Sequence, residues 1–182
     1  MKRHVIIWWI VPLVLMLSSA FSAQIFAASC EGKGLPPYIR SYLEKESSQW
    51  KIIEVSDLAP DHKTFWLRDH PHECPGFVVG AFTPSARKLY AVALISRTLN
   101  THAELLIFEK SAQKYNVKVL LSPFSAAPIP VIFKATPGTY EDWESTRKVK
   151  TRFPGITFVF YESSATLFYW SNGKFRELQV SD

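Results

Sequence analysis

Residues 89–96 read Leu89-Tyr90-Ala91-Val92-Ala93-Leu94-Ile95-Ser96, and this stretch is the most informative about the fold. It is apolar at successive positions from Tyr90 to Ile95, so both faces of an extended chain would be apolar here. A strand of this kind is central in its sheet and covered on both sides. The sequence therefore predicts a buried β-strand with packing layers above and below it.

Strand-length runs flank this central stretch at even spacing. They cover residues 77–82, 103–110 and 115–121, and polar turns separate them. Within the last run, Tyr115, Val117, Val119 and Leu121 alternate with polar residues, which predicts one inward face. Together the four runs predict an antiparallel meander.

Two short helices are predicted before the meander. Pro36 and Pro37 precede an amphipathic segment at 38–45 whose inward positions are Tyr38, Ile39, Tyr42 and Leu43. A strand at 50–55 and a helix at 62–68 follow, and the helix should end before Pro71.

The C-terminal part predicts more strands. They cover residues 131–134, 156–162, 166–171 and 174–180, whereas 137–154 reads as irregular and charged, with a turn of helix at 141–144. Asn172-Gly173 joins the last two strands and is a strong hairpin signal, because both turn positions need positive φ. The predicted fold class is α+β: one or two short N-terminal helices followed by a mostly antiparallel sheet of seven or eight strands, a meander plus a C-terminal hairpin.

Residues 1–29 read as a secretory signal. Lys2 and Arg3 precede an apolar run at 5–17 and then small residues, which is the plan of a signal peptide. The uncharged stretch is also long enough to remain as an uncleaved anchor. We expect an exported protein, periplasmic or extracellular, with a single globular domain at 30–182.

The two cysteines, Cys30 and Cys74, both follow this signal. In an oxidising compartment they most simply pair as a disulfide. The alternative is that Cys30 carries a lipid, since Ala27-Ala28-Ser29-Cys30 is a weak version of the bacterial lipoprotein box. The membrane is expected to be involved only through an uncleaved signal or a lipidated Cys30.

Composition narrows the classes of partner. The formal net charge is +5, and loss of Lys2 and Arg3 with the signal would leave +3. That excess is too small to indicate nucleic-acid binding. With 47% hydrophobic and 14% aromatic residues, the composition excludes a disordered chain.

Two resemblances follow from the motifs around the meander. Cys74-Pro75-Gly76 before a strand, and the Tyr90-Ala91-Val92 strand after a short loop, resemble a group of small exported bacterial proteins of unknown function. The same strand-loop-strand is distantly similar to FG-GAP or VCBS blades, in which an acidic loop binds calcium. The loop at 83–88 contains two cations and no carboxylate, so we expect no calcium site there.

A cluster of histidines and acids is the densest candidate for chemistry. His62, His70, His72 and Glu73 are ligand types that zinc or copper accepts, and they suggest a metal-dependent hydrolase. Their spacing matches no standard site, and the alternative is a solvated loop leading to Cys74.

A basic run near two aromatic residues is the best candidate for a partner surface. Arg147, Lys148, Lys150 and Arg152 follow Tyr140 and Trp143, and such surfaces bind polyanions. The alternation fits equally an exposed edge strand whose lysines discourage aggregation.

The remaining large aromatic residues read as structural. Trp50, Trp66 and Trp170 are expected in the core rather than on a binding surface. The sequence contains no Gly-x-Ser-x-Gly nucleophile elbow and no phosphate-binding glycine loop.

We therefore expect an exported, non-enzymatic binding or accessory domain without a cofactor, which contacts a protein, glycan or lipid surface of the envelope and has an inhibitory or protective role. The alternatives are the metal-dependent hydrolase and a structural accessory of an envelope complex.

Overall fold

The computed structural model describes residues 30, 34–85, 87–99, 101–110 and 115–181. The helices are α1 (Pro37–Glu46), the 3₁₀ helix η2 (Val55–Asp57) and α2 (Pro60–Asp69). The strands are β1 (Trp50–Ile52), β2 (Phe77–Gly80), β3 (Leu89–Ser96), β4 (His102–Lys110), β5 (Tyr115–Ser125), β6 (Val131–Ala135), β7 (Thr139–Glu141), β8 (Lys148–Lys150), β9 (Gly155–Phe160), β10 (Ser164–Ser171) and β11 (Lys174–Ser181). This order confirms the α+β class, with helices first and antiparallel strands after them.

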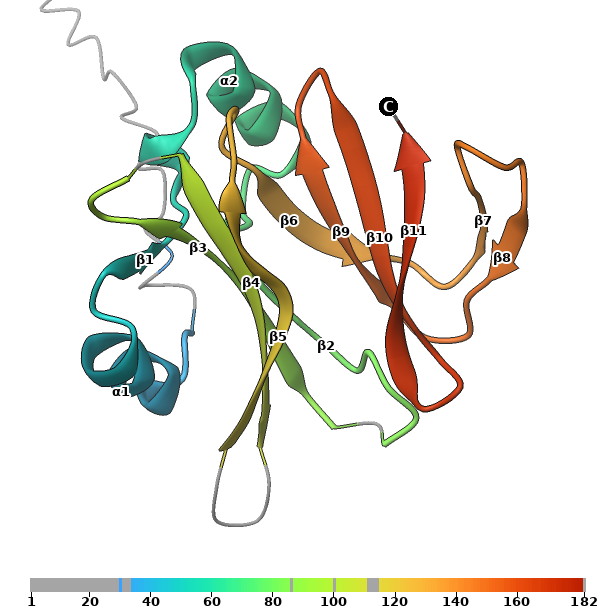
Figure 1. Ribbon diagram of the computed structural model, residues 1–182, viewed down its shortest axis with the longest axis horizontal. Coiled ribbons are helices and arrows are strands. Elements are labelled where there is room, and N and C mark those ends of the chain that lie inside the picture. The colour runs from blue at the N-terminus through green and yellow to red at the C-terminus, as the bar shows by residue number, and fades with distance from the viewer. Residues whose placement is uncertain (1–29, 31–33, 86, 100, 111–114, 182) are drawn as a thin grey trace, which may run out of the picture.

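The strands of the described residues form three sheets instead of the single sheet expected. The first has the order β1-β3-β4-β5, with β2 also paired to β3; the second has the order β11-β10-β9-β6; the third is the β7–β8 pair. Every pairing is antiparallel. Figure 1 shows four layers, from α1 through the first and second sheets to β7–β8. The meander of four runs is confirmed within the first sheet.

The main core lies between the two large sheets. Ala91, Ala93 and Ile95 of β3 face the second sheet and pack in the cluster that contains Ile156 and Phe158. The alternate residues of β3, Val92 and Leu94, pack with Ile39 of α1 on the opposite face. β3 is thus covered on both sides, as its sequence predicts.

The disulfide between Cys30 and Cys74 is present and confirms the predicted pairing. The two Cα atoms are 5.2 Å apart, and both residues are buried beside α1. The bond closes 44 residues of chain and holds the start of the described domain against the first sheet. A sulfur bonded in this way cannot also carry a lipid, so the lipidation alternative for Cys30 does not apply to this structure.

β5 departs from the alternation expected of it. Val117 pairs with Phe108 on the α1 side, but the register shifts between Leu105 and Leu106, so that Leu121 turns toward the main core. A β-bulge adds one residue to a strand and exchanges its faces. The prediction that Tyr115 and Leu121 share one face was therefore wrong.

Two further segments differ from expectation. Residues 137–154 form the β7–β8 hairpin, and its turn holds no helix at 141–144. The predicted strand at 50–55 ends at Ile52, because the chain enters η2 at Val55. The Asn172-Gly173 turn is confirmed, with φ of 51° and 79°.

The predicted signal at 1–29 lies outside the described residues. Among the residues that are described, no helix is both long enough and apolar enough to cross a membrane.

Candidate functional site

The basic run lies on β8 and on the residues that follow it, where packing alternates along the chain. Val149 packs on the outer face of the second sheet, and Thr151 is buried. Thr151 accepts a hydrogen bond from Gly138 N–H at 3.0 Å through its hydroxyl, and its own N–H donates to the Gly138 carbonyl at 2.8 Å. Because these two residues face inward, Lys150 and Arg152 are held outward on either side of Thr151.

The turn of this hairpin neutralises two of its cations. Arg147 lies 3.0 Å from the Asp142 carboxylate, and Lys148 lies 3.6 Å from that of Glu141. Burial acts against ionisation of Asp142, but hydrogen bonds from Ser145, from the Glu144 N–H and from Arg147 hold the pKa of its carboxyl below its ordinary value. Arg147 and Lys148 therefore already have acidic partners.

Lys150 and Arg152 have no such partner among the described residues. No carboxylate of the described chain forms an ion pair with either side chain. Both residues are exposed, and both line a groove of about 510 Å³ beside the end of the β10–β11 hairpin. We call it the basic groove; its lining includes Lys150, Arg152, Phe153, Tyr169, Trp170 and the turn at 171–173.

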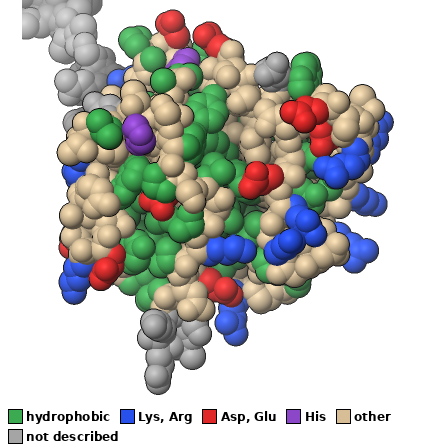
Figure 2. Space-filling model, in the orientation of Figure 1, with side chains coloured by type: hydrophobic (Ala, Val, Ile, Leu, Met, Phe, Trp, Pro, Cys, Tyr) green, Lys and Arg blue, Asp and Glu red, His purple; other side chains and the backbone are tan. Residues whose placement is uncertain are grey.

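The surface around this hairpin carries many charged side chains (Figure 2). Lys and Arg side chains gather over β7–β8 and β11, on the right of the view, whereas a band of hydrophobic side chains runs between the two large sheets. Lys174 and Arg176 of β11 are exposed and add to this cationic side of the protein. An anion approaching the basic groove thus meets a positive surface.

Trp170 is the residue that the sequence interpretation missed. It is half-buried instead of in the core, and it lines the basic groove together with a second groove on its other side. Its ring meets Phe175 edge-on, with centroids 5.3 Å apart, which fixes its orientation. Trp50 and Trp66 are buried, as expected. The partial exposure of Trp170 follows from its place at the end of the β10–β11 hairpin, and no local sequence pattern separates it from the two buried tryptophans.

The two aromatic residues predicted beside the basic run do not line the basic groove. Tyr140 packs inward, and its hydroxyl donates to the Thr136 carbonyl at 2.5 Å. Trp143 lies at the hairpin turn, where its backbone N–H donates to the Gln179 carbonyl at 2.9 Å and the residue is 60% exposed. Of the six residues predicted for this surface, the structure brings Lys150 and Arg152 together in the groove.

The side chains of the predicted histidine cluster do not point toward one common position. His70 stacks between Trp66 and Phe133, with centroids 4.3 and 4.9 Å away, and its Nδ1 lies 3.1 Å from Glu73. His62 is buried beside Tyr161, and His72 is exposed. The described residues contain no group of three or more His, Cys, Asp or Glu side chains that could hold a metal ion. Zinc sites need three or four convergent ligands.

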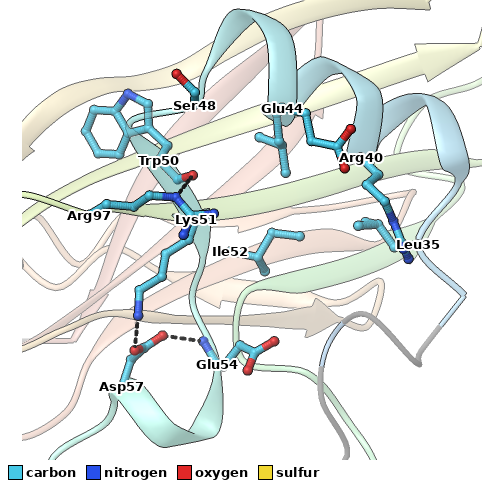
Figure 3. Close-up of a pocket in the computed structure, with 11 residues that line it drawn as sticks. Leu35, Arg40, Glu44, Ser48, Trp50, Lys51, Ile52, Glu54, Asp57 and Arg97 are labelled. Carbon is cyan, nitrogen blue, oxygen red and sulfur yellow. Dashed lines mark hydrogen bonds and ion pairs between the residues drawn. The ribbon is translucent and has the colours of Figure 1, made fainter.

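A third groove, of about 450 Å³, lies between α1, β1 and η2 (Figure 3). Its charges are balanced: Arg40, Lys51 and Arg97 face Glu44, Glu54 and Asp57. The Lys51 side chain reaches Asp57 at 2.5 Å, and Arg97 Nε donates to the Trp50 carbonyl at 3.1 Å, as the dashed lines show. Because its lining has as many carboxylates as cations, this groove carries less net positive charge than the basic groove.

Searches against protein-family models, curated proteins and solved structures find no match to this chain, so the resemblances to small exported bacterial proteins and to FG-GAP blades stay predictions.

Proposed function

We propose that this protein is an exported, non-enzymatic binding module that holds an anionic ligand in the basic groove. The observation that carries the proposal is the pair Lys150 and Arg152, which lie without acidic partners in the described chain beside an aromatic wall. Exposed cations of this kind supply attraction, and Arg adds a planar group that matches carboxylate, sulfate or phosphate.

Internal contacts that hold the lining of the groove support a role in binding. Thr151 ties the cations to Gly138, and Tyr169, which is buried, forms part of the opposite wall. A site that is already formed loses less conformational entropy when its ligand binds. The lining described for this groove includes neither a carboxylate nor a histidine, the usual proton-transfer groups of enzymes. Binding is therefore the function that the chemistry of these side chains supports best.

Export is part of the proposal and rests on two features. The N-terminal sequence has the plan of a secretory signal, and the Cys30–Cys74 disulfide is compatible with an oxidising compartment.

The test is calorimetric titration of sucrose octasulfate, a small polyanion, with sucrose as the neutral control. We expect affinity to fall roughly sevenfold to twelvefold between 50 and 200 mM NaCl, because two phosphate-like contacts release about two counterions. Reversal of both cations, Lys150→Glu with Arg152→Glu, should weaken binding more than tenfold.

The matched control reverses two exposed lysines on the helices, Lys45→Glu with Lys63→Glu, and changes the net charge by the same amount. This control should lose far less affinity than the groove variant, since its charges lie on α1 and α2. Equal losses in the two double variants would refute the groove, because net charge alone would then explain binding.

A further inference from the structure

A second, largely apolar groove adjoins the basic groove. It has a volume of about 500 Å³ and shares Pro84 and Trp170 with its neighbour. The shared residues belong to the loop after β2 and to the end of β10, and Figure 1 shows this loop passing below the β10–β11 turn. The two grooves are therefore the two sides of one wall. We call the second one the apolar groove.

The apolar groove lies at the end of the molecule where the two large sheets part. Leu89 and Ile107 line it from the first sheet, and Trp170 and Phe175 line it from the second. Leu89 and Ile107 are themselves core residues, so the groove opens directly onto the main core. Its volume is within the range of about 300–1,000 Å³ that is usual for small-molecule sites.

The charged residues around the two grooves favour one orientation of a ligand that is anionic at one end and apolar at the other. In the apolar groove, Glu109 and Lys118 both line it, so its two charges offset each other, and Lys118 lies with its Nζ 5.6 Å from the centre of the Phe175 ring. Lys150 and Arg152, which form no ion pair with any carboxylate of the described residues, lie across Trp170 in the basic groove and give that side a net positive charge. An anionic group is favoured on the basic side and an apolar chain on the other.

We propose that the two grooves form one site for an anionic amphiphile, a molecule with a single alkyl chain and a carboxylate, sulfate or phosphate head. The head lies between Lys150 and Arg152, and the chain passes Trp170 and enters the apolar groove. This assignment rests on the proposed function, because it uses the same two cations, and it adds the chemical class of the ligand.

Dodecanoate, used below its critical micelle concentration, is the direct probe, and octanoate, decanoate and neutral dodecanol are its comparisons. A fully buried methylene tightens binding about fourfold, which is about 0.8 kcal/mol. Because this groove is open on one side, we expect about twofold per methylene, and hence roughly 16-fold between octanoate and dodecanoate. Dodecanol should bind at least tenfold more weakly than dodecanoate.

A blocking variant tests the apolar groove itself. Asn116 is exposed on β5 and lines the groove, so Asn116→Trp places a large ring in its opening. We expect a loss of at least fivefold in dodecanoate affinity. The matched control, Ser122→Trp, places the same ring at an exposed position of the same strand, outside the residues that line either groove. It should bind dodecanoate as the unmodified protein does.

The outcomes separate this inference from the proposed function. If sucrose octasulfate binds through Lys150 and Arg152 but affinity does not rise with alkyl chain length, the amphiphile assignment is wrong and the anionic site stands. If dodecanoate binds and Asn116→Trp has no effect, the chain does not occupy the apolar groove and the inference fails. If chain-length dependence and blocking appear but Lys150→Glu with Arg152→Glu leaves dodecanoate affinity unchanged, the head does not lie in the basic groove and this inference fails, whereas the anionic site is then decided by the sucrose octasulfate titration alone.

Discussion

Loss of the Cys30–Cys74 disulfide should cost this domain a large part of its stability. The bond closes 44 residues of chain. In the chain-entropy treatment a loop of that length contributes about 4 kcal/mol at 25 °C, as an upper figure. For a domain of this size, 1 kcal/mol corresponds to roughly 2–4 °C in Tm, so the expected fall is roughly 8–16 °C.

The measurement is thermal unfolding followed by circular dichroism, with and without a reductant, on the unmodified protein and on Cys30→Ala with Cys74→Ala. Both cysteines are buried, so the double variant also removes packed sulfur atoms, whereas reduction leaves those atoms in place. Comparison of the two samples separates the cross-link from its packing. A fall of less than about 2 °C on complete reduction would refute the reasoning, since the loop would then add almost nothing.

Three other predictions concern single side chains. Burial raises the pKa of the Glu104 carboxyl, so its ionised form disfavours the fold at neutral pH. Glu104→Gln should therefore raise Tm by about 1–2 °C at pH 7 and lose this advantage at pH 3, where both side chains are neutral. An unchanged Tm at pH 7 would argue against this cost of burial. Because the pKa of the Asp142 carboxyl is lowered, its ionised form stabilises the turn at pH values above the ordinary aspartate pKa, and this contribution is lost as the pH falls through the pKa of the folded state. The amide NMR shift of Ser145 should therefore titrate with a midpoint below pH 3.8. A midpoint at or above pH 3.8 would contradict the hydrogen-bonded turn. Elemental analysis of the purified protein and of His70→Ala with His72→Ala should find no stoichiometric zinc or copper in either, whereas metal present only in the unmodified protein would restore the hydrolase hypothesis.

Local sequence patterns predicted most of the elements. β3 covers the predicted stretch at 89–96, and α1 starts at Pro37, with Pro36 as its N-cap residue. The Asn172-Gly173 turn has the positive φ values that its residues favour. These features depend on neighbours within a few positions, which is why the sequence alone indicates them.

Features that depend on distant contacts were not predictable. The bulge in β5 reflects its pairing with β4 and the packing of Leu121 on the second sheet. Short, charged strands such as β7 and β8 carry little apolar pattern, and their hairpin is held by Val149 and Tyr140 against the second sheet. Division into several sheets likewise arises from packing that no local pattern encodes.

The candidate site likewise combines residues that the sequence predicted with residues that only distant contacts bring in. The basic run marked Lys150 and Arg152 as a surface, but the sequence does not show which cations its own acids neutralise. Trp170 lies about 20 residues further along the chain, in the β10–β11 hairpin, and only the packing of this hairpin beside Lys150 and Arg152 brings it to the groove. A site assembled from two hairpins is visible only once both have been placed.

The most direct test of the basic groove is an NMR titration of the ¹⁵N-labelled protein with sucrose octasulfate. We predict that the largest amide shift changes fall at residues 149–153 and 169–173, and that they are lost in Lys150→Glu with Arg152→Glu. Shift changes centred on the groove between α1 and β1, around Arg40 and Arg97, would contradict it.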